Sequence, residues 1–460
     1  MVHYRIGYGR SQITVGIEAI REKLETLARR FLPRNHFARN TIILSLGTTF
    51  GQGLAVAASP VLSRLYTPND FGVLAIYASI LGISLNISSF RYEFAIPLAE
   101  DNQSALEILV LCLVLVLFTS FLLAIGIIWL NPDQIPFQRG AALKQYIWLL
   151  PIGLLLGGSY QIFSYWAVRE RMFPALARTT VAQGMGSVVT QLGFGLFKSG
   201  PLGLLLGQIA GHSAGLRVLG THVWKTHKHA LRRISLSGLL AVAVRYKKFP
   251  LYQSGASLLN VGGLEAPSLL FAGYYGVEVA GWFFLTQKVL SVPLSLIGNS
   301  VSQVFLGEAA RLLKEPPKLQ NLYRQLNKKL FAIGLLPAII LAIGGSSIFK
   351  LVFGHEWVQS GTYAQVMAFV FLAKLTTDSV INFAVIERQD LSFIWALIRL
   401  VLVLFSILLP AWYGRPGFWA IVSFSSAMIV SYVLKYVMWE FAIMRIPVQG
   451  KPVVSQQNGQ

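Results

Sequence analysis

The sequence contains 460 residues, of which 54% are hydrophobic and only 13% are charged, about half the charged fraction of an ordinary soluble domain. Apolar runs of about twenty residues recur along it, and because runs of this length cross a bilayer as helices, they exclude a soluble globular protein. The formal net charge of +20 lies mostly between the runs, which indicates anionic lipid headgroups rather than nucleic acid as the partner. The sequence therefore predicts an all-α polytopic membrane protein.

Residues 1–39 contain eight basic residues and no long apolar core, so they are not expected to be a cleavable signal peptide. Apolar residues recur there at helical spacing, with basic residues on the other face, at Ile17, Ile20, Leu24, Leu27 and Phe31. This pattern is typical of a helix that lies on the membrane surface. An irregular cytoplasmic tail is the alternative.

About twelve spans of roughly twenty residues follow. Residues 40–220 are expected to form an N-terminal lobe, with spans near 40–63, 71–90, 107–130, 146–166, 174–197 and 201–220. A basic connector covers residues 221–248. Residues 249–445 are expected to form a C-terminal lobe, with spans near 249–272, 279–305, 330–353, 362–383, 392–413 and 417–443. Residues 446–460 remain as a tail.

The loop charges predict the orientation. Twelve spans place both termini on one side, and about 27 Lys and Arg residues fall on that side against about five on the other. Because basic loops stay inside, we expect the connector and both termini to be cytoplasmic, in the cell inner membrane.

The two halves of the sequence look related. Pro60 aligns with Pro267, and Gly72 with Gly281. "WAVRERMFPALARTTV" (166–181) resembles "FAVIERQDLSFIWALIRLV" (383–401) at the corresponding corner of the other half. Six helices per half insert both copies in the same orientation, which predicts an axis along the membrane normal. Chance similarity between apolar helices is the alternative.

Charged residues inside the spans are the main functional signal. Each costs a few kcal/mol at the bilayer centre, so it is expected to face a protein interior or a wet cavity. Seven such residues occur, in both halves: Arg64, Arg178, Glu265, Lys288, Lys374, Asp378 and Arg399. Five of the seven are cationic, which suits an anionic substrate such as a phosphate or pyrophosphate headgroup. Lys288 lies deepest and is the first expected ligand.

Several of these charged residues could instead have a structural role. Lys374 and Asp378 share a helix face and could neutralise each other. Arg64 and Arg399 could extend to the membrane interface, which is the preferred interpretation for Arg64. Glu265 could pair with a cation or carry a coupling proton.

Prolines within or near the spans remove backbone hydrogen bonds, so hinges or kinks are expected at Pro60, Pro267 and Pro293. No HExxH, CxxC, P-loop or GxSxG pattern occurs, so we expect no enzyme activity, no metal, no cofactor and no ATP hydrolysis. His222, His227 and His229 lie in the basic connector and are expected to lack carboxylate partners, which favours a solvated loop over a metal site.

Two motifs carry a resemblance to a known family, "SRLYTPNDFG" (63–72) and "RYEFAIPLAEDN" (91–102). They resemble the polysaccharide-export branch of the MOP flippase superfamily, the Wzx-like O-antigen and exopolysaccharide translocases. Weaker matches are "GYYGVEVAGWFFLTQKVLSVPLSLIGNSVSQVF" (273–305) and "LVFGHEWVQSGTYAQVM" (351–367). The resemblance spans about residues 40–443, and the segment 1–39 is a departure from the family.

The resemblance implies two six-helix bundles around a central cavity that opens alternately to either side of the membrane. It also implies an undecaprenyl-pyrophosphate-linked oligosaccharide as substrate, moved to the periplasmic leaflet for lipopolysaccharide or exopolysaccharide synthesis. A polysaccharide polymerase and chain-length machinery are the implied partners. Arg91 and Glu93 carry over as motif residues without an assigned role.

Two other functions remain open at this point. A cation-coupled multidrug antiporter of the same superfamily would use acidic lumen residues, for which only Glu265 and Asp378 qualify. A membrane glycosyltransferase or polymerase would need acidic catalytic residues near one interface, which Glu93, Glu100 and Asp101 could supply.

Overall fold

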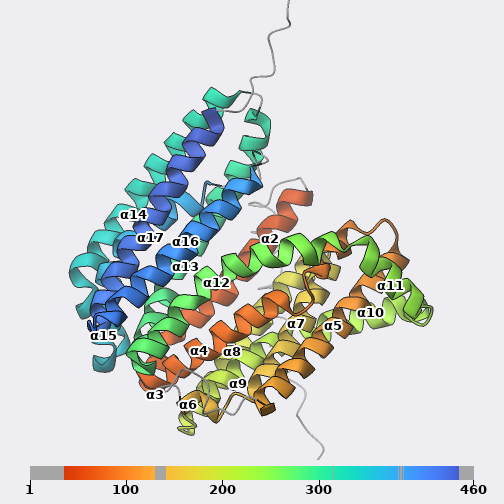
Figure 1. The fold of residues 1–460 in the computed structure, drawn as a ribbon, viewed down its shortest axis with the longest axis horizontal. Coiled ribbons are helices and arrows are strands. Elements are labelled where there is room, and N and C mark those ends of the chain that lie inside the picture. Colours follow the sequence, from red (N-terminus) through yellow and green to blue (C-terminus); the bar gives the residue numbers. More distant parts are fainter. Residues whose placement is uncertain are drawn as a thin grey trace, which may run out of the picture.

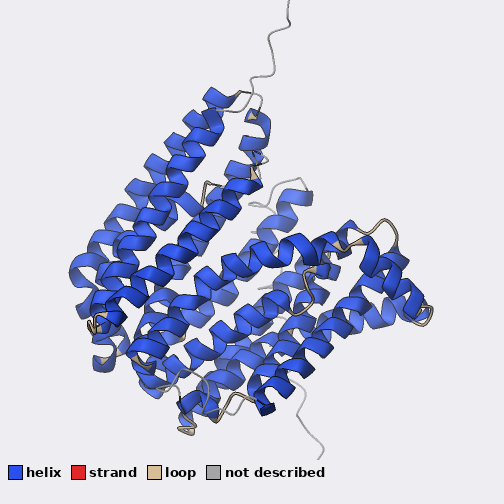
Figure 2. Ribbon diagram, in the orientation of Figure 1, coloured by secondary structure: helices blue, strands red, loops and turns tan. Residues whose placement is uncertain are grey.

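The computed structural model describes residues 36–129, 141–313, 315–381, 383, 386 and 388–444. These residues form helices joined by short turns, and no strand occurs among them (Figure 2). The predicted surface helix in the first 35 residues and the tail 446–460 lie outside the described residues.

The helices of the first half are α2 (His36–Ala57), α3 (Ser59–Leu65), α4 (Pro68–Ile87), α5 (Asn102–Trp129), α6 (Ala141–Lys144), α7 (Leu149–Arg169), α8 (Phe173–Leu196) and α9 (Pro201–Ala214). A 3-10 helix, η1 (Tyr92–Leu98), joins α4 to α5. The second half contains α12 (Ser254–Leu270), α13 (Val277–Leu312), α14 (Pro316–Phe353), η5 (His355–Trp357), α15 (Val358–Asp378), α16 (Gln389–Trp412) and α17 (Gly417–Met444). Each predicted span overlaps one of these helices or an adjoining pair.

Two helical bundles are inclined to one another, one built around α5, α7, α8 and α9 and the other around α14 to α17 (Figure 1). Between them, α12 contacts α4 and α16, and α13 contacts α4 and α15. The bundles converge where α3 meets the end of α14. There the Ser63 hydroxyl donates to the Phe353 carbonyl at 2.9 Å, and the Trp357 indole N–H donates to the Ser63 carbonyl at 2.9 Å. These bonds join the lobes at that end of the molecule.

The corner between α3 and α4 is built by its own sequence. The Thr67 hydroxyl accepts from the backbone N–H of Asp70 at 3.3 Å, and the Asp70 carboxylate accepts from the backbone N–H of Thr67 at 2.9 Å. This reciprocal capping box satisfies two N–H groups that α4 would otherwise leave unbonded, and Pro68 occupies the first turn, where a missing N–H costs nothing. The Thr-Pro-Asn-Asp corner is therefore a helix start.

The aligned glycines Gly72 and Gly281 meet where α4 crosses α13. A Cβ atom on Gly72 would overlap the carbonyl oxygen of Val277, and one on Gly281 would overlap that of Pro68 and lie 2.9 Å from the amide nitrogen of Gly72. Equivalent positions contact each other where they lie on a twofold axis. The crossing is thus the contact expected if the two halves are related by such an axis.

The connector is helical rather than a loop. Residues Leu216–Leu231 form α10 and Leu236–Arg245 form α11. The prediction that its histidines lack carboxylate partners is wrong for His227, whose Nε2 lies 3.9 Å from Glu170 and whose ring contacts Trp166. Glu170 follows α7, so sequence proximity did not reveal it. Among the described residues, no group of three or more His, Cys, Asp or Glu side chains could hold a metal ion.

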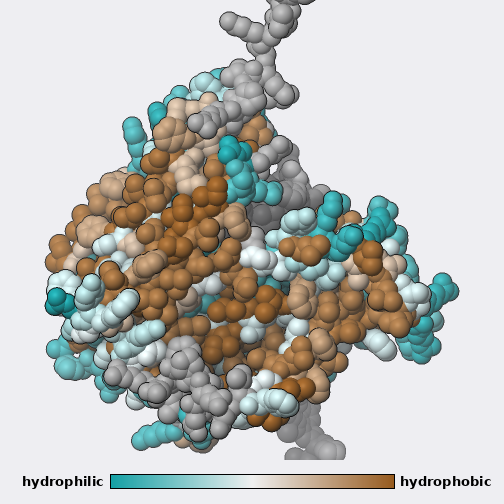
Figure 3. Space-filling model, viewed as in Figure 1, coloured by the Kyte–Doolittle hydropathy of each residue, from teal (hydrophilic) through white to brown (hydrophobic). Residues whose placement is uncertain are grey.

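Five helices in the described residues are long and apolar enough to cross a membrane on their own: α4, α5, α14, α16 and α17. Their outer faces expose large apolar side chains such as Phe121 (61%), Ile343 (78%) and Phe405 (66%). Broad hydrophobic areas cover the face seen in Figure 3. Soluble monomers rarely expose so much contiguous apolar surface, so a multi-pass membrane protein is the consistent interpretation.

Candidate functional site

Two adjoining cavities lie where the bundles face each other. The central cavity, about 580 Å³, is lined by α4 and α9 of the first lobe and by α12, α13, α15 and α17 of the second. The second, about 550 Å³, is lined by α2, α13 and α15, and we name it the lysine cavity. Ser291, Leu294 and Lys374 line both, so the two cavities share a wall.

The lysine cavity brings together two of the predicted cations, Lys288 from α13 and Lys374 from α15. Within the described residues, neither ammonium group has a hydrogen bond or an ion pair. Four serines also line this cavity: Ser291, Ser295, Ser302 and Ser379. The hydroxyls of Ser291 and Ser295 donate to the backbone carbonyls of Lys288 and Val292, and the Asp378 carboxylate borders the same cavity. The feature that suits a multivalent oxyanion is therefore the pair of ammonium groups that have no direct ion pair among the described residues.

The direct ion pair of Asp378 is with Lys435 and not with Lys374, although the Lys374 charge lies close enough to act on the Asp378 carboxylate. The Lys435 ammonium group on α17 lies 2.5 Å from the Asp378 carboxylate, whereas Lys374 lies beyond ion-pair distance. Helical spacing suggested the local pair, but α17 packs against α15 and supplies a nearer cation. The sequence analysis did not select Lys435. Lys435 lies inside the twelfth predicted span, and a position inside a span was the criterion by which the other charged residues were selected.

Arg399 does not line either cavity. Its side chain is only 3% exposed and its guanidinium donates to the backbone carbonyl (2.9 Å) and side-chain oxygen (2.8 Å) of Asn260 on α12. The guanidinium also lies 4.5 Å from the Trp395 ring centre. This burial between α12 and α16 supports neither a substrate contact nor a side chain that extends to the membrane interface.

Two further predicted cations also lie away from the cavities. Arg64 is exposed on α3, and its guanidinium donates to the Pro60 carbonyl of its own helix. Arg178 is exposed on α8. Neither is among the residues that line the two cavities, and the interface position preferred for Arg64 stays a prediction. The predicted site is therefore reduced to the residues of α13 and α15.

Glu265 lines the central cavity from α12, close to Ser79 of α4. His212 and Gln208 of α9 line the same cavity. The remaining wall is largely apolar, with Phe284, Phe371 and Phe424 among its residues. Aromatic faces beside a few polar groups are suited to a bulky, partly polar ligand.

The predicted hinge prolines occupy different settings. Pro60 is in the first turn of α3, where a proline is well tolerated. Pro267 lies inside α12, lines the central cavity and is followed by the π-helical turn η4 (Phe271–Tyr275). Pro293 lies inside α13. Because proline removes one helical hydrogen bond, the end of α12 is locally irregular, and its role as a hinge remains a prediction.

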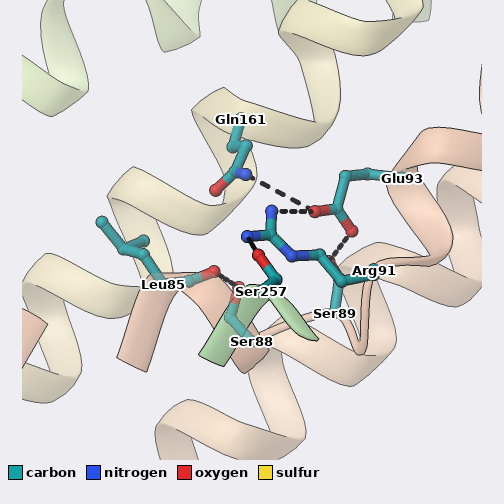
Figure 4. Close-up of polar contacts among 7 residues, drawn as sticks. All are labelled: Leu85, Ser88, Ser89, Arg91, Glu93, Gln161 and Ser257. Atoms are coloured by element: carbon teal, nitrogen blue, oxygen red, sulfur yellow. Dashed lines mark hydrogen bonds and ion pairs between the residues drawn. The ribbon is translucent and has the colours of Figure 1, made fainter. Parts of the chain in front are cut away.

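Arg91 and Glu93 form a buried polar cluster that connects the two lobes (Figure 4). Glu93, 1% exposed, accepts from Ser89, from Arg91 at 3.4 Å and from Gln161 of α7 at 3.4 Å. Arg91 also donates to Ser257 of α12. Its backbone is left-handed, with φ of 64°, which directs the chain from α4 into η1. These motif residues therefore hold helices together and do not line either cavity.

The same region argues against a glycosyltransferase site. Glu93 is buried in the cluster just described, whereas Glu100 is exposed and pairs with Arg245 at 2.6 Å. Asp101 accepts from the backbone N–H of Ser104 at 2.7 Å, and this bond lowers the pKa of the Asp101 carboxyl. Glu93 is thus bound in the buried cluster, Glu100 in a surface ion pair and Asp101 in a helix cap. The three carboxylates do not face a common site.

The buried cluster gives a stability prediction. Arg91→Met should lower the free energy of unfolding by about 3 kcal/mol, because it leaves the Glu93 carboxylate buried without a counter-ion. Thermal melting of the detergent-purified protein would measure this. Arg388→Met is the matched control, since its exposed ion pair with Asp390 should contribute little. Equal melting temperatures for Arg91→Met and the wild type would contradict a structural role for the cluster.

Comparison with known proteins identifies the family. The model of a family described as polysaccharide biosynthesis protein matches residues 61–362, about two thirds of the chain. The chain belongs to this polysaccharide biosynthesis protein family. It is 21% identical over 365 residues to the lipopolysaccharide biosynthesis protein WzxC of Escherichia coli, covering 76% of this chain and 70% of the relative. It is 22% identical over 325 residues to the succinoglycan biosynthesis transport protein ExoT of Rhizobium meliloti, covering 68% of this chain and 62% of the relative.

Solved structures show the fold of this polysaccharide biosynthesis protein. It is similar to the lipid II flippase MurJ in an inward closed conformation, with a TM-score of 0.65 and 13% identity over 88% of this chain and 90% of that one. It is also similar to an inward-facing multidrug resistance MATE transporter of the MOP superfamily, with a TM-score of 0.55 and 14% identity over 88% and 96%. The predicted MATE-like, all-α membrane fold and the resemblance to polysaccharide-export MOP proteins are confirmed.

Proposed function

We propose that this polysaccharide biosynthesis protein is a flippase that moves an undecaprenyl-pyrophosphate-linked oligosaccharide from the cytoplasmic to the periplasmic leaflet of the inner membrane. The observation that carries the proposal is the lysine cavity, where two ammonium groups with no direct ion pair among the described residues adjoin the central cavity between the lobes. The pyrophosphate binds at Lys288 and Lys374, and the sugars occupy the central cavity. The names of WzxC and ExoT support an envelope polysaccharide as the substrate class.

In this mechanism the substrate is carried without bond breakage, so the protein acts as a transporter and not as an enzyme. The lobes rock about the crossing of α4 and α13 and expose the cavities to each side of the membrane in turn. A polysaccharide polymerase and chain-length machinery then use the translocated unit on the periplasmic side.

A cation-coupled multidrug antiporter is the second candidate, favoured by the likeness of fold to MATE transporters. It would bind cations at lumen carboxylates. Of the two predicted carboxylates, Asp378 is neutralised by Lys435, which leaves Glu265. The charge of the lysine cavity therefore favours the anionic substrate.

Complementation of a flippase-deficient strain tests the proposal, with surface polysaccharide detected on immunoblots and drug susceptibility measured in parallel. Restored surface polysaccharide with unchanged drug resistance is the expected result. Drug resistance without polysaccharide would contradict the flippase and support the antiporter.

The proposed orientation is testable by cysteine labelling, because the single native cysteine, Cys112, is buried. A cysteine replacing Lys225 in α10 should react with a membrane-impermeant maleimide only after the inner membrane is permeabilised. A cysteine replacing Asn69 at the start of α4 should react in spheroplasts with intact membranes. The opposite pattern would contradict cytoplasmic termini.

A further inference from the structure

We propose that Lys435 is a positioning residue that keeps Lys374 available for an anionic ligand by neutralising Asp378. The inference rests on the proposed anion site in the lysine cavity and adds the reason why one of its two lysines remains unpaired. It assigns a function to a buried lysine that contacts neither cavity.

Asp378 has two cations within reach of its side chain. Lys374 lies one helical turn earlier on α15, at the spacing at which helical ion pairs form. Lys435 lies on α17, 57 residues further along the chain, and its ammonium group is the one found 2.5 Å from the carboxylate. Asp378 lines the lysine cavity and its side chain is 35% exposed, so the carboxylate borders the same space as Lys374.

Lys435 is held in this place by its surroundings. Its side chain is 9% exposed, and its ammonium group lies 4.4 Å from the centre of the Trp395 ring on α16. The Trp395 indole N–H donates to the Ser431 carbonyl at 3.0 Å, which fixes the ring. Arg399 lies 4.5 Å from the same ring. These contacts hold the Lys435 ammonium group against Asp378 and Trp395, and Lys435 is not among the residues that line either cavity.

The charge balance of the lysine cavity depends on this pairing. With Lys435 as the direct partner of Asp378, neither Lys288 nor Lys374 has a direct ion pair among the described residues that surround the cavity. Without the Lys435 charge, Asp378 would have Lys374 as its nearest cation, and one of the two binding groups would be occupied. In a poorly solvated cavity, this internal pair competes directly with an incoming anion.

The test uses purified protein in detergent, with inorganic pyrophosphate as the probe and isothermal titration calorimetry as the readout. Lys435→Met should weaken binding about tenfold or more, because Asp378 then recruits Lys374. The double variant Lys435→Met with Asp378→Asn should recover affinity to within about threefold of the wild type, since Lys374 is again unpaired. In a Lys374→Met background, Lys435→Met should weaken binding much less than in the wild type, because no Lys374 ammonium group remains for Asp378 to recruit.

The Lys374→Met background separates positioning from a general structural defect, because loss of packing would weaken binding whether or not Lys374 is present. Asp378→Asn alone keeps Lys435 in place and should bind pyrophosphate at least as tightly as the wild type, which covers the case in which Lys435→Met does not fold. Weaker binding by Asp378→Asn, or no recovery in a folded double variant, would overturn the inference alone. A wild-type protein that does not bind pyrophosphate would overturn the proposed anion site and this inference with it.

Discussion

Replacing Gly72 by valine should abolish export and strongly reduce the amount of folded protein. The side chain would be placed against the backbone carbonyl of Val277 at the crossing of α4 and α13, and a backbone atom cannot move aside as the end of a side chain can. The two helices would have to separate, at a cost of more than about 3 kcal/mol, the upper part of the range for overpacked sites. Gly281→Val should give the same result from the other helix, where the obstacle is the Pro68 carbonyl.

Gly193→Val is the matched control for this pair. Gly193 also lies within a long helix, α8, but a Cβ atom there would meet no atom of the described residues within 4 Å. Melting temperature and surface polysaccharide measured on all three variants would separate the effect of the crossing from the loss of a helical glycine. Normal export by Gly72→Val would show that α4 and α13 do not need to approach so closely.

Replacing Lys288 by alanine should abolish export while the protein remains inserted in the membrane. Lys288 is one of the two unpaired cations of the lysine cavity, so its removal halves the positive charge available to a pyrophosphate group. We expect a loss of at least about 100-fold in surface polysaccharide, the effect of removing a charged contact worth roughly 3 kcal/mol. Lys374→Ala should behave similarly. Immunoblots of the membrane fraction would verify insertion.

Arg64→Ala and Arg178→Ala are informative controls, because the sequence placed both in the substrate site and the structure places neither on a cavity wall. Both variants should retain most of the wild-type export. Full export by Lys288→Ala, or equal losses in Arg64→Ala and Lys288→Ala, would contradict the assignment of the lysine cavity.

The positions of the helices are local properties that the sequence predicted in most cases, although α14 begins at Pro316, well before the expected start near residue 330. The fifth span was expected near 174–197 and α8 occupies Phe173–Leu196; the twelfth was expected near 417–443 and α17 occupies Gly417–Met444. Hydropathy over twenty residues, prolines at first turns and capping residues all act within a few positions of one another, so they can be recognised along a chain. The connector was misjudged because basic composition indicates a polar environment but does not prevent a helix, as α10 shows.

The site was predicted only in part. Lys288 and Lys374 were expected to lie in a cavity and they do line one, but Arg64, Arg178 and Arg399 were counted with them on charge alone. A charge inside a span indicates that it must be compensated and does not indicate where its partner lies. The Arg399 guanidinium is hydrogen-bonded to Asn260, and the Asp378 carboxylate is paired with Lys435. Both partners lie on helices that are distant in the sequence.

The sequence by itself determined that this chain is a bundle of apolar helices, approximately where those helices lie, and which family it resembles. Only the tertiary structure decided which of the described cations have a direct ion pair and which do not. It also decided that Gly72 and Gly281 lie against each other. The physical reason is the distance along the chain over which each interaction acts. Helix formation and membrane burial depend on residues close together in the chain, whereas the free charge of a cavity depends on which distant helices pack side by side.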